Sequence, residues 1–407
     1  MARSLKRPLR KKEHPEKPKQ KIQGEIDVPF MLLSVLLVVI GLVMLLSASY
    51  PSAYYDVSNI TGGDAFYYFK RQAIFALLGF GVMYGISKLN YRGLQGLSLT
   101  ILLLAFVLML AVKVPGLGVE VNGATRWLKY PMRWQPSELG KFGLILFFSA
   151  RLSKRDERIP LSFNPRTGLG RFGNLLERSG FFELVPYAIV LVIMIGLLAI
   201  EPHMSASIQM IVIAAAILFA GGIAAGWFIA GGALAIGGLT VIILGTDYMT
   251  SRITMWQNPW SDALDKGMQA VQSMLAIGSG GLFGVGLANS RQKFLYLPES
   301  QNDFIFSVVC EELGLVGASL ILAIFALLII RGYWLALHAR DKFGSLVIVG
   351  IITLFAFQVF ANVAVVSNLF PVTGISLPFF SYGGTALLIQ MAEIGLVLSI
   401  SRQNPIN

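Results

Sequence analysis

Ten apolar runs constrain this chain more than any other feature of its sequence. Each run is about 17 to 25 residues long, which is enough for a helix to cross the ~30 Å hydrocarbon core of a membrane. Hydrophobic residues make up 55% of the chain and charged residues only 14%. The sequence therefore predicts an all-α polytopic membrane protein. We place its spans at residues 28–48, 72–88, 94–112, 137–152, 184–200, 205–222, 227–245, 303–330, 344–367 and 384–401.

The basic residues predict how the chain is oriented. Residues 1–27 hold nine Lys or Arg against four Asp or Glu, and residues 151–183 hold seven against four. Both segments adjoin spans, as cytoplasmic loops that obey the positive-inside rule do. We therefore expect both termini in the cytoplasm: a disordered basic tail (1–27), one ten-span domain (28–401) and a short tail (402–407). The net charge of +11 is explained in this way, and we expect no nucleic-acid partner.

The longest loop outside the cell is expected at 246–302, between spans seven and eight. Its four basic and four acidic residues, together with Trp256 and Trp260, favour a folded cap over an irregular loop. Within it, residues 268–278 have the apolar spacing of a short interfacial helix. The run GSGGLFGVG at 278–286 follows no strand and lacks a Lys-Ser/Thr pair, so we interpret it as tight turns against membrane helices.

Two groups of charged residues stand at predicted span boundaries. Asp303 begins the eighth span, either as a helix cap or as a functional group facing a cavity. On a helical wheel Glu311 lies about 80° from Asp303, and Glu312 lies on the opposite side, where we expect a partner on another helix. The small or polar residues that share the Asp303 face are Ser307, Cys310 and Gly314.

The second group lies in the stretch NGATRWLKYPMRWQPSELGK at 122–141. Glu138 and Lys141 are three residues apart and share one helix face just inside a span, where an unpaired charge is costly. They are either an ion pair that fixes helices or part of a substrate pocket. The nearby turn EPHM at 201–204 is interpreted as a turn without chemistry. With one cysteine and three histidines, the chain offers no zinc-type cluster.

Several long motifs occur in an order that resembles the SEDS family (shape, elongation, division and sporulation), which includes RodA, FtsW and SpoVE. These motifs are NGATRWL with QPSELGK, NPWSD, QSMLAIGSGGLFGVGL, QKFLYLPESQNDFIFSVVCEELGLVG and FPVTGISLPFFSYGG. The resemblance implies a ten-span peptidoglycan glycosyltransferase of the bacterial cytoplasmic membrane. It also implies that the protein polymerises lipid II together with a class B penicillin-binding protein, with other division proteins as further candidates.

The same resemblance carries residue roles. Asp303 matches the family's essential acidic residue, and we expect it to act as the base or to hold a Mg²⁺ or Mn²⁺ ion; no organic cofactor is expected. Glu311 is expected to line the same cavity. The residues at family motif positions are Arg126, Glu138, Lys141 and Lys293, and the cations expected to bind diphosphate are Arg126, Lys141, Arg252 and Lys293. The chain departs from the family at Thr125, often basic there, and at His203, often Asp.

Two other classes of protein fit ten spans with internal charges. A transporter or lipid flippase would carry polar groups through the depth of several spans, whereas here the candidate groups lie mostly at the outer boundary. A non-catalytic scaffold for division proteins would not need Asp303. The sequence leaves division, elongation and sporulation unseparated, although the stretch FFSYGGTALLIQMAEIGLVLSISR favours the FtsW/SpoVE side.

Overall fold

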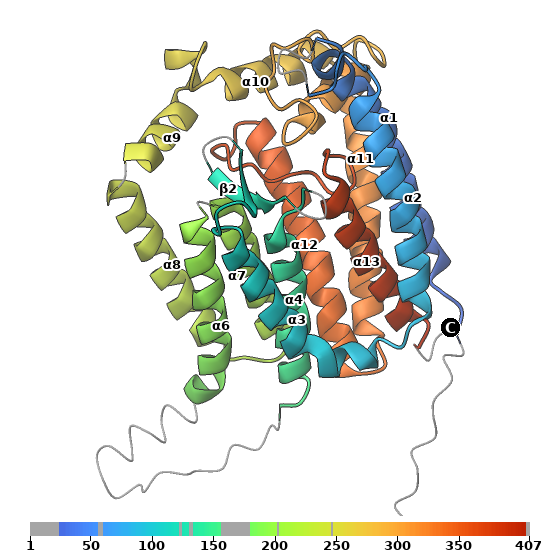
Figure 1. The fold of residues 1–407 in the computed structure, drawn as a ribbon, viewed down its shortest axis with the longest axis vertical. Coiled ribbons are helices and arrows are strands. Elements are labelled where there is room, and N and C mark those ends of the chain that lie inside the picture. Colours follow the sequence, from blue (N-terminus) through green and yellow to red (C-terminus); the bar gives the residue numbers. More distant parts are fainter. Residues whose placement is uncertain are drawn as a thin grey trace, which may run out of the picture.

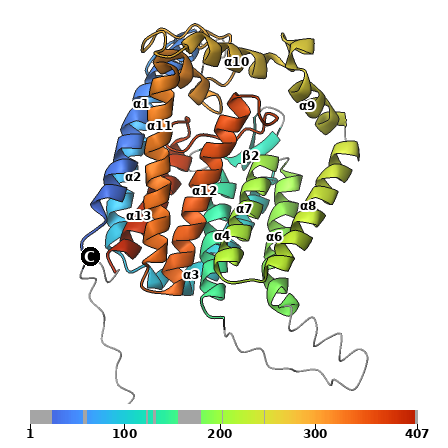
Figure 2. The ribbon, with the colours of Figure 1, turned by 180° about the vertical axis from the view of Figure 1, so that it is seen from behind.

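The computed structural model is a helical bundle in which one helix coincides with each of the ten expected spans (Figures 1 and 2). It describes residues 24–55, 60–121, 124–129, 133–155, 180–201, 203–245 and 247–403. The bundle helices are α1 (Val28–Tyr54), α2 (Tyr67–Lys88), α3 (Arg92–Ala111), α4 (Pro136–Leu152), α6 (Phe181–Ile200), α7 (Met204–Ala220), α8 (Ala225–Gly245), α11 (Ile305–Leu337), α12 (Lys342–Val366) and α13 (Gly384–Ser401).

Length and apolar composition make six helices of the described ranges able to cross a membrane. They are α1, α3, α6, α11, α12 and α13, and shorter apolar helices lie within α7 and α8. The chain is therefore a multi-pass membrane protein, as the sequence predicts. Its centre lies where α4, α7 and α12 meet. A Cβ atom at Gly350 of α12 would lie within 3 Å of Ile145 on α4 and Ile217 on α7, so this glycine permits the close packing.

The two described ends of the chain lie together at one end of the bundle (Figure 1). Arg402 Nε donates to the Gly24 carbonyl at 3.1 Å, and the Asp27 amide donates to Ser401 Oγ at 3.2 Å. Asp27 also pairs with Arg331, at the far end of α11 from the cap, at 2.5 Å. The ends of the ten-helix domain are thus on the same side, as an even number of spans requires.

The opposite end of the bundle, called the cap end below, carries the folded segment expected from 246–302. It contains α9 (Asp247–Gln257), a 3₁₀ helix (Pro259–Asp262) and α10 (Met268–Gly280), which lie across the bundle in Figure 1. Trp256 Nε1 donates to the Asn368 carbonyl at 3.0 Å, and Ser273 Oγ donates to the Val366 carbonyl at 2.6 Å. The predicted cap and its helix at 268–278 are confirmed.

A β-hairpin near the cap end departs from the all-α prediction. Strand β1 (Gly118–Val121) pairs antiparallel with β2 (Ala124–Leu128), with Val121 opposite Ala124. That register leaves two residues between the strands, and the sequence there is Asn-Gly, the strongest short signal for a two-residue hairpin connection. The hairpin was missed because the charged stretch after it was interpreted only as a membrane boundary.

Helix α11 is broken at Gly314, whose backbone has φ 65° and ψ −171°. The break exposes main-chain groups on both sides, and the glycine-rich run after α10 pairs with them. The amides of Val285 and Gly286 donate to the carbonyls of Glu311 and Glu312, at 2.9 and 3.1 Å. The amides of Leu315 and Val316 donate in return to residues 281 and 282, at 2.9 and 3.1 Å. Four main-chain groups beside the break thus find partners in this run, as buried backbone requires.

Glycines make this close approach possible. A Cβ atom at Gly280 would lie 2.0 Å from the Cys310 carbonyl oxygen, and one at Gly284 would lie 2.1 Å from that of Glu312. The run at 278–286 consequently forms turns against a membrane helix, as expected from the sequence.

Candidate functional site

Asp303 lies in the turn before α11. The helix begins at Ile305 after Phe304, and no side chain caps it, so the helix-cap role considered for Asp303 is not the one it adopts. Asn362 Nδ2 holds the turn by donating to the main-chain carbonyls of Asp303 and Ile375, at 2.7 and 2.8 Å. Within the described residues the Asp303 carboxylate makes no hydrogen bond or ion pair.

The electrostatic surroundings of Asp303 suit a proton acceptor. Burial is the largest effect and, with the charge of Glu299, raises the pKa of Asp303 to about 6, while Arg126 acts in the opposite direction. Arg126 comes from β2, and its Nε donates to the main-chain carbonyl of Glu201 at 3.3 Å. The hairpin therefore brings a cation from the first half of the chain into electrostatic reach of Asp303. The sequence predicted both residues but not how they meet.

A small polar cavity, about 50 Å³ in volume, adjoins this turn. Gly374 links the two, since it lines the cavity and a Cβ atom there would lie 3.3 Å from Asp303 Oδ2. The space suffices for a few water molecules or one polar group of a ligand. The lining residues are Gln135, Glu138, Lys141, His203, Ser205, Ala206, Gln209, Gln358, Gly374 and Ser376.

Lys141 is the cation of the cavity. Its side chain is 2% exposed, and Nζ lies 2.8 Å from Glu138 Oε1 and donates to Gln209 Oε1 at 2.7 Å. The predicted pair on one helix face is confirmed, and both of its members line the cavity. The two interpretations left open by the sequence, an ion pair and a pocket wall, describe the same residues.

The turn at 201–204 contributes more than the sequence suggested. His203 lines the cavity with Gln135 Nε2 3.2 Å from its ring, and burial lowers the pKa of this histidine to about 3, so the ring is neutral. Glu201 is buried, and neither of its carboxylate oxygens has a hydrogen-bond partner in the described residues. Burial raises the pKa of Glu201 to about 7. An ionisable pair beside Pro202, in a turn next to a charged motif, was the available sequence signal.

Two deeper groups were not singled out from the sequence. Gln358 of α12 lines the cavity, and its Oε1 is buried without a hydrogen-bond partner within the described ranges. Glu393 of α13 is 1% exposed, and the charges that act on it are those of Lys141 and Glu138. Apolar sequence surrounds both residues, so only their three-dimensional neighbours reveal them.

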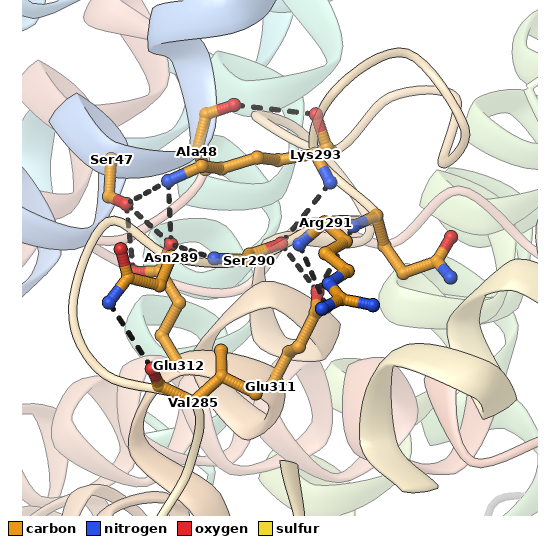
Figure 3. Close-up of polar contacts among 11 residues, drawn as sticks. Ser47, Ala48, Val285, Asn289, Ser290, Arg291, Lys293, Glu311 and Glu312 are labelled. Atoms are coloured by element: carbon orange, nitrogen blue, oxygen red, sulfur yellow. Dashed lines mark hydrogen bonds and ion pairs between the residues drawn. The ribbon is translucent and has the colours of Figure 1, made fainter. Parts of the chain in front are cut away.

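The other predicted residues lie outside the cavity lining. Arg252 of α9 is exposed, and its Nη1 donates to the Val372 carbonyl at 2.6 Å, two residues from Gly374. Lys293 is buried, and its Nζ lies 2.8 Å from Glu312 Oε1. Glu311 accepts from the Arg291 amide at 2.9 Å (Figure 3). Lys293 and Glu311 thus bind partners within the protein, and neither residue lines the pocket.

Asp303 is the candidate carboxylate for a metal ion. The described part of the chain has no group of three or more His, Cys, Asp or Glu residues placed to hold a metal. Mg²⁺ commonly binds one or two carboxylates together with substrate phosphates and water, so Asp303 alone fits only a metal that arrives with a phosphorylated ligand.

Fold and site together define a class: a multi-pass membrane protein with a polar, partly buried pocket at one end of its bundle. Residues 28–406 match the FtsW/RodA/SpoVE family, described as cell cycle proteins. The chain belongs to this family.

Known proteins are similar to this chain over nearly its full length. A probable peptidoglycan glycosyltransferase FtsW of Geobacter sulfurreducens is 38% identical over 92% of this chain and 95% of its own. Stage V sporulation protein E of Bacillus subtilis is 38% identical over 92% and 97%. Among solved structures, a chain from a study of polymerization and crosslinking by a peptidoglycan synthase complex matches with a TM-score of 0.72 and 28% identity, over 94% and 99%. The rod shape determining protein RodA of Thermus thermophilus matches at 0.63 and 26%, over 93% and 98%.

Proposed function

We propose that this protein is a peptidoglycan glycosyltransferase that polymerises lipid II into glycan strands for septum synthesis in cell division or sporulation. The observation that carries the proposal is the Asp303 carboxylate, which is half buried, unbonded within the described residues and adjacent to a cavity lined by Lys141. The names of the FtsW and sporulation relatives support this activity.

The proposed chemistry assigns the proton to Asp303. A sugar hydroxyl of one substrate attacks the anomeric carbon of another, and the Asp303 carboxylate accepts the hydroxyl proton as the new carbon–oxygen bond forms. The bond from that carbon to the diphosphate oxygen breaks, and its electron pair leaves with the diphosphate. A pKa of about 6 keeps Asp303 mostly ionised at neutral pH while leaving it close to the pH at which it works.

The cations of the site have the complementary task. Negative charge grows on the diphosphate as it departs, and fixed positive charge in a partly buried site stabilises it strongly. Arg126 and Lys141 are our candidates for this contact, with Glu138 holding Lys141 in place. Arg252 stands at the exposed side, where it would meet the diphosphate as it enters or leaves. Should Mg²⁺ or Mn²⁺ take part, Asp303 is the carboxylate that would hold it, and it would neutralise phosphate charge.

Location and partner follow from the same proposal. The basic segments 1–27 and 151–183 favour a cytoplasmic position for the chain ends, which leaves the cap end and the site at the outer face of the membrane. A class B penicillin-binding protein is the proposed partner, supported by the structural relative studied in a peptidoglycan synthase complex. Other division proteins are further candidates.

The test is Asp303→Ala in purified protein given labelled lipid II, with and without the penicillin-binding partner. We expect the wild type to form glycan chains and the variant to form none, although it folds normally. Asp265→Asn is the matched control, because this exposed carboxylate lies in the cap, away from the cavity lining. Undiminished polymerisation by Asp303→Ala would contradict the catalytic role of Asp303.

One observation favours lipid transport as the second candidate. Glu393 places a carboxylate inside the bundle near Lys141, as transporters place charges within their spans. A liposome assay for lipid scrambling separates the two activities. Scrambling by the wild type without any glycan formation would support the transporter and overturn the enzyme.

A further inference from the structure

Two adjacent glutamates on α11 hold a loop against the bundle (Figure 3), and neither of them lines the cavity near Asp303. Glu311 accepts hydrogen bonds from the amide of Arg291 and from Ser290 Oγ. Glu312 accepts from Lys293 Nζ at 2.8 Å. This group is called the anchor cluster below and consists of Ser47, Ser290, Lys293, Glu311 and Glu312.

The ion pair in this cluster is fully enclosed and also bonded to α1. The side chains of Lys293 and Glu312 are 2% and 0% exposed. Ser47 Oγ of α1 donates to both Glu312 oxygens at 2.7 and 2.8 Å, and Lys293 Nζ lies 2.9 Å from the same Ser47 oxygen. A single residue of the loop, Lys293, therefore ties α1 to α11 through a buried charge pair.

The segment between Lys293 and Asp303 connects the ion pair to Asp303 and is itself held by hydrogen bonds. Leu297 is buried, and its amide donates to the Gln292 carbonyl at 2.8 Å, which closes a compact turn. Ser300 Oγ donates to the Ala48 carbonyl of α1 at 3.4 Å, next to Ser47. Asp303 thus follows a chain that is attached to α1 and α11 at one end and to Asn362 at the other.

Stability alone is a weak reason for such a pair. Burying two charges costs much of what their attraction returns, and apolar residues of similar size often serve stability equally well. Removing one partner is different, because the remaining charge is left buried without compensation. Its desolvation then favours conformations in which the loop moves toward solvent. The retained pair suits a role in fixing one geometry of the loop.

We propose that the Lys293–Glu312 ion pair positions Asp303 by holding segment 290–303 on α1 and α11. The proposal rests on the proposed function, in which Asp303 must meet a sugar hydroxyl. Neither Lys293 nor Glu312 touches substrate. They affect the rate of catalysis only through the position of Asp303.

Kinetics of single and paired variants test the proposal. Lys293→Met and Glu312→Met each leave one buried charge, and Glu312→Gln is a milder variant that keeps a hydrogen-bonding group. A displacement of about 1 Å can cost on the order of 100-fold in rate, so we expect kcat to fall by about that factor in each single variant, with KM nearly unchanged. Lys293→Met combined with Glu312→Met is expected to recover most of kcat. Lys266→Met, at an exposed cap lysine, is the matched control and should change neither constant.

Three results would overturn the proposal. A rise in KM with a double variant as inactive as Lys293→Met would mean that Lys293 binds the diphosphate itself. An unchanged kcat per folded molecule in the single variants would leave the pair a purely structural role. A double variant that fails to regain kcat while folding normally would deny the pairing.

Hydrogen exchange tests positioning without relying on glycan synthesis. The amides of residues 291–303 should exchange faster in each single variant and return toward the wild-type rate in the double variant. Unchanged exchange in the single variants would contradict the proposal. If the wild type makes no glycan at all, the proposed function fails, and the exchange result still decides whether the pair positions this segment.

Discussion

The anchor cluster and the cavity near Asp303 are built from the same kinds of side chain and behave differently. In the anchor cluster, the lysine, glutamate and serine side chains form hydrogen bonds with one another, and a backbone amide of the loop donates a further hydrogen bond to Glu311. Around the cavity, the Asp303 carboxylate and Gln358 Oε1 have no hydrogen-bond partner within the described residues. Buried polar groups are almost always bonded in folded proteins, so unused bonding capacity beside a cavity indicates a ligand. The comparison separates charged residues that stabilise the fold from charged residues that are available to a substrate.

Lys141→Met gives the largest expected effect on the cavity side of this comparison. It removes the cation proposed to meet the diphosphate, which we expect to lower polymerisation by about 100-fold or more. It also leaves Glu138 without its partner, so the free energy of unfolding should fall by about 3 to 5 kcal/mol. Polymerisation of labelled lipid II and thermal unfolding measure the two effects, with Lys266→Met as the exposed control. Normal activity would show that Lys141 has only a structural role.

Glu201→Gln sharpens the comparison through pH. Glu201 is buried and its pKa is raised to about 7, above the ordinary 4.5, so ionising it opposes folding. The wild type should therefore lose stability relative to the variant as pH rises from about 4.5 to 7, with a constant difference above 7. The difference should reach roughly 3 kcal/mol. Unfolding measured between pH 4.5 and 8 checks this. A difference that does not change with pH would mean that Glu201 finds a partner when ionised.

Gly374→Ala is the smallest change and tests the contact between the cavity and Asp303. The glycine has φ of 73°, and the added Cβ atom would lie 3.3 Å from Asp303 Oδ2. Left-handed backbone costs alanine about 1 to 2 kcal/mol, and we expect polymerisation to fall about tenfold as the carboxylate is displaced. Gly383→Ala is the control, because its backbone is extended and its Cβ atom would meet Ala386 at an ordinary 3.5 Å. Equal activity of the two variants would contradict the contact.

Local patterns were sufficient for the parts of this fold that depend on nearby residues. The spans and the helix at 268–278 follow from apolar spacing, and the Glu138–Lys141 pair follows from a separation of three residues on one helix. Glu312 was expected to find a partner on another helix, and Ser47 of α1 is that partner. The spans, the helix at 268–278 and the Glu138–Lys141 pair follow from the period of the α-helix.

Long-range contacts account for what the sequence did not reveal. Lys293 lies 246 residues from Ser47 in the chain, so a basic residue in a polar loop was interpreted as a phosphate ligand. The helical wheel drawn from Asp303 does not apply, because α11 begins at Ile305 and breaks at Gly314. Glu393 stands in apolar sequence, and only the packing of α13 near Lys141 gives it meaning.

The most direct measurement is the pH dependence of lipid II polymerisation by the wild type and by Asp303→Asn, which keeps the shape of the side chain and removes its basicity. Because the pKa of Asp303 is raised to about 6, the wild-type rate should rise about tenfold per pH unit below 6 and level off above it. Asp303→Asn should be slower by about 10² to 10⁴-fold and lack this rise. A variant with the wild-type rate and the same rising limb would show that another group accepts the proton.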